Sequence, residues 1–336
     1  WTRLLGQVVG GSVFAFATML ASFLSGITLG SFVSSRLATT RARAASGLAL
    51  AQLGSALASL LAFLALGAVT PLALWLGAGV AGGAGANALL AGLVLVPSTL
   101  CIGATFPFAV RVLARSEFDA GASSARVYAW NTVGAICGAL GAGFFIVPAL
   151  GFAGALTLAV ATQLALAVAC ARLVPPAGRR IALVAGIALV ASVALRLDEP
   201  WPLLRWSPFE RQPAEGDLTW FGVGRSATVL LHEGSSHWVL RTNGLPEAGI
   251  LPPGQRGANT TAEALSVLPV LARPAVRSML VVGLGGGSVL ESVPPSVTSL
   301  DVIELEPKVL DANRALSGLR ARDPLADPRL HVHIGD

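Results

Sequence analysis

The chain has 336 residues, of which 54% are hydrophobic and 12% charged, and its mean hydropathy is +0.71. Ordinary soluble domains carry roughly a quarter charged residues, so the composition excludes a wholly soluble protein. The net charge of +5 arises in residues 1–197, which hold eleven Arg and two acids, whereas residues 198–336 hold twelve Lys and Arg and sixteen acids. No basic patch interleaves with aromatic residues, so we expect no nucleic-acid partner.

The first 197 residues consist of long apolar segments. A membrane-spanning helix needs about 20 mostly apolar residues, and we predict six or seven spans, the number depending on whether the short third segment crosses. A tight turn at Gly151 is expected to separate the fifth and sixth. The predicted segments are Ser12–Ser34, Ala45–Ala68, Pro71–Gly83, Ala86–Leu113, Val127–Leu150, Phe152–Leu173 and Arg180–Leu197.

Small and polar residues inside these segments predict how the helices pack. The Gly-x-x-x-Gly pairs Gly26/Gly30 and Gly134/Gly138 favour close approach of neighbouring helices. Three polar side chains lie at membrane depth, and we interpret them as interhelical hydrogen-bonding groups, a lined pathway being the alternative. These residues are Asn87, Asn131 and Gln163.

The cysteines and histidines predict no metal site. All three cysteines fall in apolar stretches without Cys-x-x-Cys spacing, which favours buried free thiols over disulfides or metal ligands. The histidines are interpreted as surface or ordinary strand residues, since no third ligand accompanies the two that alternate near the end of the chain. The residues concerned are Cys101, Cys137 and Cys170, and His232, His237, His331 and His333.

The composition changes after Arg196 and divides the chain into four regions. Residues 1–197 are the predicted transmembrane domain, and residues 198–221, rich in Trp and Pro, read as an interfacial linker. Residues 222–276 are expected to form a small β region and a helix over Thr261–Leu271, with a turn at Asn243-Gly244. Residues 277–336 are expected to begin a Rossmann-like nucleoside-binding domain.

The chemistry-bearing pattern lies in this last region. The strand-like run Ser278–Val282 leads into the glycine-rich stretch Gly283–Gly287 and a short helix, and a second strand, Ser299–Ile303, is followed by Glu304. Pro307 suits the first turn of the next helix, and Leu330–Ile334 reads as a third strand. Strand, glycine loop, helix, strand, acid, helix and strand in this order predict the start of a parallel doubly wound sheet.

This pattern predicts a site for a nucleoside. Glycines at the first strand-helix turn let a ligand approach the backbone, and an acid at the end of the second strand accepts hydrogen bonds from ribose hydroxyls. Glu304 lies 17 residues after Gly287, and Ser288 replaces the third glycine of a dinucleotide fingerprint. The spacing therefore favours one nucleoside without a pyrophosphate, such as an S-adenosyl compound.

Several stretches resemble the spermidine synthase (polyamine aminopropyltransferase) family in its membrane-anchored form. The likeness covers roughly residues 222–336, and the helical part also resembles the fused multi-helix members of that family. The matching stretches in the second half are Val239–Ala248, Ala262–Pro274, Met279–Ser288, Asp301–Val309 and Asp327–Asp336, and those in the helical part include Phe23–Gly30 and Gly103–Pro107.

The resemblance implies a reaction and a set of site residues. Decarboxylated S-adenosylmethionine would give its aminopropyl group to an amine such as putrescine, in polyamine biosynthesis. The implied ligand-binding residues are Gly283, Gly285, Gly286, Gly287, Glu304 for the ribose and Asp336 for the adenine, with Glu247 and Glu263 on the substrate side. The proton-accepting Asp of the family is expected beyond Asp336.

The sequence departs from the family at three motifs. Gly286 replaces the loop Asp, Glu247 replaces a Gln, and only Glu263 remains of a Tyr-His-Glu motif. Two further hypotheses therefore stay open beside aminopropyl transfer. One is a methyltransferase using S-adenosylmethionine itself, and the other is a membrane sensor or transporter with a degenerate nucleoside-binding domain.

The setting of the protein is predicted less directly. We expect an integral protein of the plasma (inner) membrane, with the lipid bilayer and a small amine as partners. A homo-oligomer is one alternative for its oligomeric state, which stays open. Basic loops at 36–43, 111–126 and 172–180 leave the orientation ambiguous, and nucleotide chemistry favours a cytoplasmic α/β domain. Because the chain starts at Trp1 and ends at Asp336 on a strand, we expect a piece of a longer protein that is inactive by itself.

Overall fold

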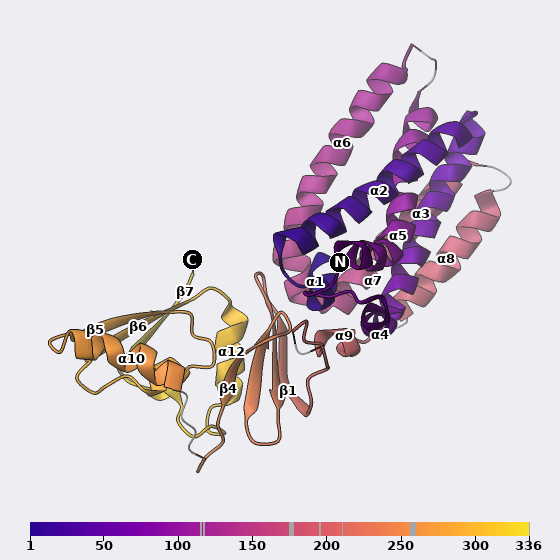
Figure 1. Ribbon diagram of the computed structural model, residues 1–336. Helices are drawn as coiled ribbons and strands as arrows, with labels where there is room; N and C mark the ends of the chain where they lie inside the picture. The colour runs from indigo at the N-terminus through magenta and orange to yellow at the C-terminus, as the bar shows by residue number, and fades with distance from the viewer. Residues whose placement is uncertain are drawn as a thin grey trace. The chain divides into compact units, whose positions relative to one another are not determined.

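The structure is a computed structural model that describes residues 1–114, 116, 118–174, 178–194, 196–209, 211–255 and 260–335. The chain forms two compact units, Trp1–Leu204 and Arg205–Asp336. The first is helical and the second combines helices with two sheets (Figure 1), so the predicted order of a helical region followed by an α/β region is confirmed. The units divide inside the segment 198–221 that was interpreted as a linker.

The helical unit contains eight helices of eight residues or more, together with a π-helical turn and one short helix, among its described residues. Their bounds are α1 Thr2–Val9, α2 Val13–Leu37, α3 Arg41–Leu64, α4 Leu66–Leu76, α5 Ala84–Leu113, α6 Ala120–Gly141, η1 Ala142–Ile146, α7 Val147–Ala171, α8 Gly178–Ala194 and α9 Trp201–Leu204. Side-chain caps start two of the long helices: Ser12 accepts a hydrogen bond from the Ala15 N–H, and Thr40 accepts one from the Arg43 N–H.

Within the described residues, four segments are long and apolar enough to cross a membrane: Val13–Leu37, Arg41–Leu64, Ala84–Leu113 and Ala120–Ala171. The last is 52 residues long and is broken at Gly151, whose φ of 70° and ψ of −172° are not helical. The break confirms the turn predicted at Gly151 and divides this segment into two helical parts. The third and seventh predicted segments are short, since α4 has 11 residues and α8 has 17.

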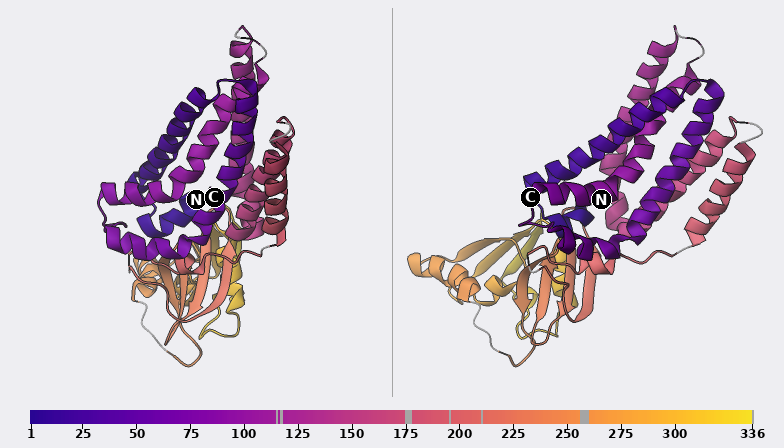
Figure 2. Two further views of the ribbon diagram at one scale, coloured as in Figure 1. Left: turned by 90° about the vertical axis from the view of Figure 1, so that its right-hand side faces the viewer. Right: turned by 45° about the vertical axis from the view of Figure 1, so that its right-hand side comes forward.

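Close helix contacts hold the bundle together. α2 packs on α5, α3 packs on α5 and α7, and α7 packs on α8 (Figures 1 and 2). A Cβ atom at Gly26 would collide with Thr99, and one at Gly30 would collide with the Leu100 backbone. The prediction that Gly26 and Gly30 allow close approach is therefore confirmed.

The second glycine pair behaves differently. Nothing lies within 4 Å of a Cβ built at Gly134 or Gly138, and α6 has no buried residue among those described. α6 lies at the edge of the bundle (Figure 1), so the prediction that this pair packs against a neighbouring helix is wrong within this chain. Cys137 is exposed on α6, whereas Cys101 and Cys170 are half-buried, and all three are free thiols.

The three polar residues predicted at membrane depth lie in different surroundings. Gln163 Nε2 donates to Ser55 Oγ at 3.0 Å between α7 and α3, which confirms the interhelical hydrogen bond predicted there. Asn87 instead binds the loop before its own helix, accepting from Gly79 N and donating to Gly79 O. Asn131 lies exposed on α6.

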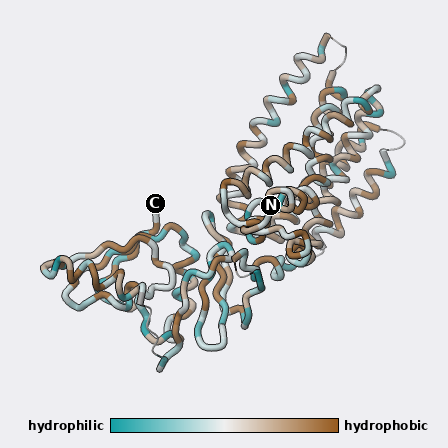
Figure 3. The backbone as a smooth tube through the Cα atoms, viewed as in Figure 1, coloured by the Kyte–Doolittle hydropathy of each residue, from teal (hydrophilic) through white to brown (hydrophobic). Residues whose placement is uncertain are grey.

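The outer surface of the helical unit is apolar. Phe14, Trp75 and Trp130 are exposed by 85%, 81% and 72%, and Figure 3 shows hydrophobic residues along the lengths of the helices. Such a surface is the reverse of that of a water-soluble bundle, in which the apolar stripe faces inward.

The α/β unit begins with a four-stranded antiparallel sheet of strand order β1-β2-β3-β4. Its strands are β1 Asp217–Val223, β2 Thr228–Glu233, β3 Trp238–Thr242 and β4 Leu245–Ile250. Asn243 and Gly244 have φ of 51° and 81°, the conformation of a tight hairpin turn, as predicted. β1 starts inside the presumed linker, and β1 and β4 were not predicted.

A second sheet of three parallel strands follows in the order β5-β6-β7. Strands and helices alternate here as predicted. The elements are α10 Thr260–Ala272, β5 Ser278–Val282, α11 Ser288–Glu291, β6 Ser299–Glu304, α12 Pro307–Ala315, η2 Pro324–Ala326 and β7 Leu330–Ile334.

One apolar core joins the two sheets of the α/β unit. It includes Leu231 and Leu240 from the antiparallel sheet, Leu300 and Val302 from β6, and Leu316 after α12, all fully buried. In the same unit, the loop after β5 lies against β4, and the loop after β6 contacts the β1–β2 loop.

Candidate functional site

A cleft of about 680 Å³ lies within the α/β unit, where the carboxyl ends of β5 and β6 meet the antiparallel sheet and the start of α10. Parallel sheets bind ligands at this edge. The described residues that line it are Ser226, Ala227, Thr242, Asn243, Glu247, Ala248, Thr261, Ala262, Leu265, Gly283 to Val289, Glu304, Leu305, Glu306 and Val309.

The loop Gly283–Gly287 forms one wall of the cleft. Gly283, Gly285 and Gly287 have φ of 90°, 51° and 80°, a region that residues with a Cβ rarely adopt. Gly283 N donates to Ile303 O at 2.8 Å and Gly287 N donates to Leu284 O at 2.9 Å, so the loop is a closed turn on the end of β6. The predicted helix after the loop is one turn long and ends at Glu291, short of the expected Val293.

Gly286 lies where a side chain has no room. A Cβ at this position would lie 2.5 Å from Ala248 Cβ and 3.2 Å from Ile250 Cγ1 of β4. The antiparallel sheet therefore occupies the space that a side chain at position 286 would need. This is the position at which the family that the sequence resembles carries an Asp.

Glu304 stands opposite the loop at the end of β6, and it is 7% exposed. Its Oε2 accepts a hydrogen bond from Leu284 N at 2.8 Å, and its Oε1 accepts one from Glu306 N at 2.9 Å. The carboxylate therefore fixes the glycine loop, and each oxygen retains a lone pair for a hydroxyl donor in the cleft.

Glu306 is a second buried carboxylate in the cleft, at 3% exposure, and no sequence pattern indicated its contacts. It accepts hydrogen bonds from Ser226 N, Ser226 Oγ and Ala227 N at 2.8–3.1 Å, and it caps α12 through Lys308 N. Burial raises the pKa of the Glu306 carboxyl, but these hydrogen bonds outweigh it and hold the pKa below its ordinary value. Glu306 thus ties the β1–β2 loop to the parallel sheet.

The other predicted site residues are placed unequally. Glu247 is exposed and lines the cleft beside Asn243, whereas Glu263 is exposed on α10 and is not among the lining residues, although its neighbours Thr261 and Ala262 are. Asn243 Oδ1 accepts a hydrogen bond from Thr228 N, so this side chain also ties the β3–β4 turn to the start of β2. Asp336 lies outside the described residues.

Charge in the cleft is of one sign. Glu247, Glu304 and Glu306 line it, and none of its described lining residues is Lys, Arg or His. The wall thus offers carboxylate acceptors together with glycine backbone, a set suited to hydroxyl groups and to cationic nitrogen or sulfonium centres.

The histidines lie away from this cleft. His232 is 4% exposed and accepts a hydrogen bond from Arg241 Nε at 3.2 Å, so the prediction that it is a surface residue is wrong. β2 is buried along almost its whole length. The polar residues that follow His232 in the sequence did not indicate this burial. His333 Nε2 lies 2.8 Å from Asp301 Oδ1 on the exposed face of the parallel sheet.

Comparison with known proteins identifies no family. No protein-family model matches the chain, and no curated protein matches it. Among solved structures, spermidine synthase in complex with the transition state analogue AdoDATO is similar over 35% of this chain, with 20% sequence identity and a TM-score of 0.31. The chain spans 41% of the length of that enzyme.

Proposed function

We propose that the cleft binds an S-adenosyl compound and that the protein is a membrane-bound, spermidine synthase-like aminopropyltransferase. The observation that carries the proposal is the pairing of Glu304 with the loop Gly283–Gly287, joined by the hydrogen bond from Leu284 N. A Rossmann-like domain places an acid and a glycine loop in this relation to hold a ribose against open backbone.

In the proposed reaction, the lone pair of an amine nitrogen attacks the aminopropyl carbon attached to the sulfonium sulfur of decarboxylated S-adenosylmethionine. The carbon–sulfur bond breaks, methylthioadenosine leaves as a neutral thioether, and the alkylated nitrogen gives up one proton to water. The acidic lining of Glu247, Glu304 and Glu306 supports the binding of cationic reactants. Within this scheme Glu304 accepts hydrogen bonds from the ribose hydroxyls, and Glu247 faces the amine.

A turnover assay tests the proposal. The full-length protein is incubated in detergent with decarboxylated S-adenosylmethionine and putrescine, and methylthioadenosine is measured by mass spectrometry. Release that is lost in Glu304→Ala supports aminopropyl transfer. Release of S-adenosylhomocysteine from S-adenosylmethionine instead supports the methyltransferase, and binding without either product supports a sensor or transporter.

We also propose that the helical unit is embedded in the plasma (inner) membrane, with the α/β unit in the cytoplasm. The exposed apolar residues and the four long segments support membrane insertion. Retention in the membrane fraction after alkaline carbonate washing supports it, and release into the supernatant contradicts it. Labelling of cysteines introduced in the α/β unit of intact cells and of inverted vesicles reports the side.

A further inference from the structure

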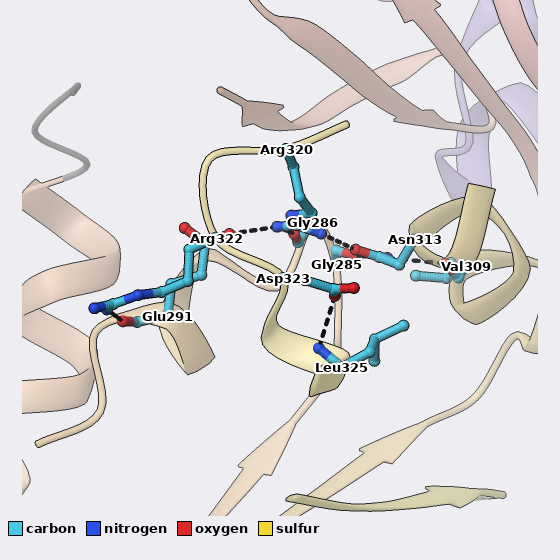
Figure 4. Close-up of polar contacts among 9 residues, drawn as sticks. All are labelled: Gly285, Gly286, Glu291, Val309, Asn313, Arg320, Arg322, Asp323 and Leu325. Carbon is cyan, nitrogen blue, oxygen red and sulfur yellow. Dashed lines mark hydrogen bonds and ion pairs between the residues drawn. The ribbon is translucent and has the colours of Figure 1, made fainter. Parts of the chain in front are cut away.

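A buried guanidinium lies behind the glycine loop, on the side away from the cleft. The Arg320 side chain is 1% exposed, and its Nη2 contacts Gly286 O at 2.6 Å and Glu291 Oε1 at 2.5 Å (Figure 4). Its Nη1 donates to Asn313 Oδ1 at 2.9 Å. Burying a charge costs several kcal/mol unless it is paired, and here a carboxylate, a carbonyl and an amide oxygen surround it.

Asn313 continues this network to the neighbouring glycine. It is fully buried on α12, and its Nδ2 donates to Gly285 O at 2.7 Å and to Val309 O at 2.9 Å. Two buried side chains therefore hold the carbonyls of two successive loop glycines (Figure 4).

The orientation of these carbonyls decides what the loop presents to a ligand. In a planar trans peptide, a carbonyl and the N–H that follows it point in opposite directions. With Gly285 O bound to Asn313, the N–H of Gly286 is turned the other way, toward the cleft that Gly286 lines. The same hydrogen bonds keep the carbonyl oxygens of Gly285 and Gly286 away from the oxygen-rich ribose.

The loop needs such external support because of its composition. Gly283, Gly285 and Gly287 have more accessible backbone conformations than any other residue type, and the single turn of α11 adds little order. We propose that Arg320 and Asn313 are positioning residues, which hold the loop in its ligand-binding conformation without touching the ligand, and that Glu291 holds Arg320 in place. The ligand side of this inference rests on the proposed nucleoside-binding function.

Two near-isosteric variants and one control test the inference in the whole chain. Arg320→Lys keeps the charge but loses the fork that reaches two acceptors, and Asn313→Asp replaces the amide that donates to Gly285 O by a carboxylate. Arg314→Ala is the control, because Arg314 follows Asn313 on α12, is 64% exposed and forms an ion pair with Asp311 on the surface of that helix. The readouts are deuterium exchange of the 283–288 amides, the affinity for methylthioadenosine and the melting temperature.

We expect exchange in the loop to rise and the affinity to fall by about tenfold or more in both variants, as the cost of leaving a buried loop carbonyl without its donor predicts. Arg314→Ala should match wild type. Loop exchange equal to wild type in both variants overturns the inference, and so does faster exchange spread evenly over the α/β unit with a lowered melting temperature. If wild type binds no nucleoside, the proposed function fails while loop exchange still decides the positioning role. If one variant does not fold, the other decides.

Discussion

The two units use glycine for different physical reasons. In the helical unit, Gly30 and Gly103 have helical backbone, and the facing helix occupies the space that a Cβ would need. In the α/β unit, Gly283 and Gly285 have open space around a Cβ but positive φ values. A substitution fails in the first case through size and in the second through backbone conformation, so the same residue type demands different tests.

The units also differ in where their apolar side chains lie. The helical unit exposes Phe14 and Trp75 by more than four-fifths, whereas the α/β unit buries Leu240 and Leu300 completely. Under the proposed membrane location, lipid covers the first set, and folding of the second depends on the hydrophobic effect in water. The helices of the bundle must therefore be held together by close packing. Gly26 and Gly30 permit this packing because they leave room for the facing helix.

The largest expected effect is at this packing. Gly30→Leu should destabilise the helical unit by more than about 3 kcal/mol, because the collision is with the Leu100 backbone, which cannot turn aside as a side chain can. Thermal unfolding in detergent measures it.

Gly134→Leu is the matched control, since it belongs to the same sequence pattern but faces open space. It should leave the melting temperature within about 1–2 °C of wild type, the range expected when surface changes stay near or below 0.5 kcal/mol. Equal damage from both substitutions would contradict the assignment of α6 as an unpacked helix and would show that a second copy or another protein covers it.

A smaller loss is expected where α7 breaks. Gly151 has φ of 70° and ψ of −172°, and Gly151→Ala should cost about 3 kcal/mol or less because only glycine adopts this region readily. The Glu199 carboxylate, which accepts a hydrogen bond from Ala153 N at 3.3 Å, would also have to move. The check is the free energy of unfolding of the detergent-solubilised protein, with Gly186→Ala, which has open space in α8, as control. An unchanged Gly151→Ala protein would mean that the break is not required.

The smallest of the three effects is in the α/β unit. Glu306→Gln should destabilise it by about 2 kcal/mol, because charge-assisted hydrogen bonds from Ser226 and Ala227 become neutral ones. Deuterium exchange of β2 amides as a function of urea reports on this unit alone. Asp311→Asn, on the exposed face of α12, should change little.

The Glu306 effect depends on pH in a defined direction. Its pKa is lower in the folded than in the unfolded state, so its stabilisation is fully present above the ordinary Glu pKa of about 4.3 and is lost as the pH falls through the folded value. Wild type should lose more stability than Glu306→Gln between pH 6 and pH 3. Parallel losses would contradict the role of the charged form.

Local patterns predicted much of this molecule. The run Ser278–Val282, the glycine cluster and Glu304 follow one another within a few elements, and the physics of a strand-loop-helix turn specifies their relation. The break at Gly151 and the turn at Asn243 were likewise predictable, because few residues adopt those backbone angles.

What the sequence could not reveal are contacts between residues far apart. Glu306 meets Ser226 across 80 positions, and Arg320 meets Gly286 across 34. Nothing in the local surroundings of Arg320 distinguishes a buried guanidinium from a solvated one. The packing of α6 was mispredicted for a related reason, since apolar composition does not tell an exposed helix from one that packs against other helices.

The central claim is that Glu304 and the loop Gly283–Gly287 bind a nucleoside. The most direct measurement is calorimetric titration of methylthioadenosine into the wild-type chain, Glu304→Gln and the surface control Asp311→Asn. We predict saturable binding that weakens by about 10- to 100-fold in Glu304→Gln, as loss of hydrogen bonds to a charged acceptor implies, with Asp311→Asn equal to wild type. Equal affinity of Glu304→Gln and wild type, or no binding to wild type at all, would contradict the claim.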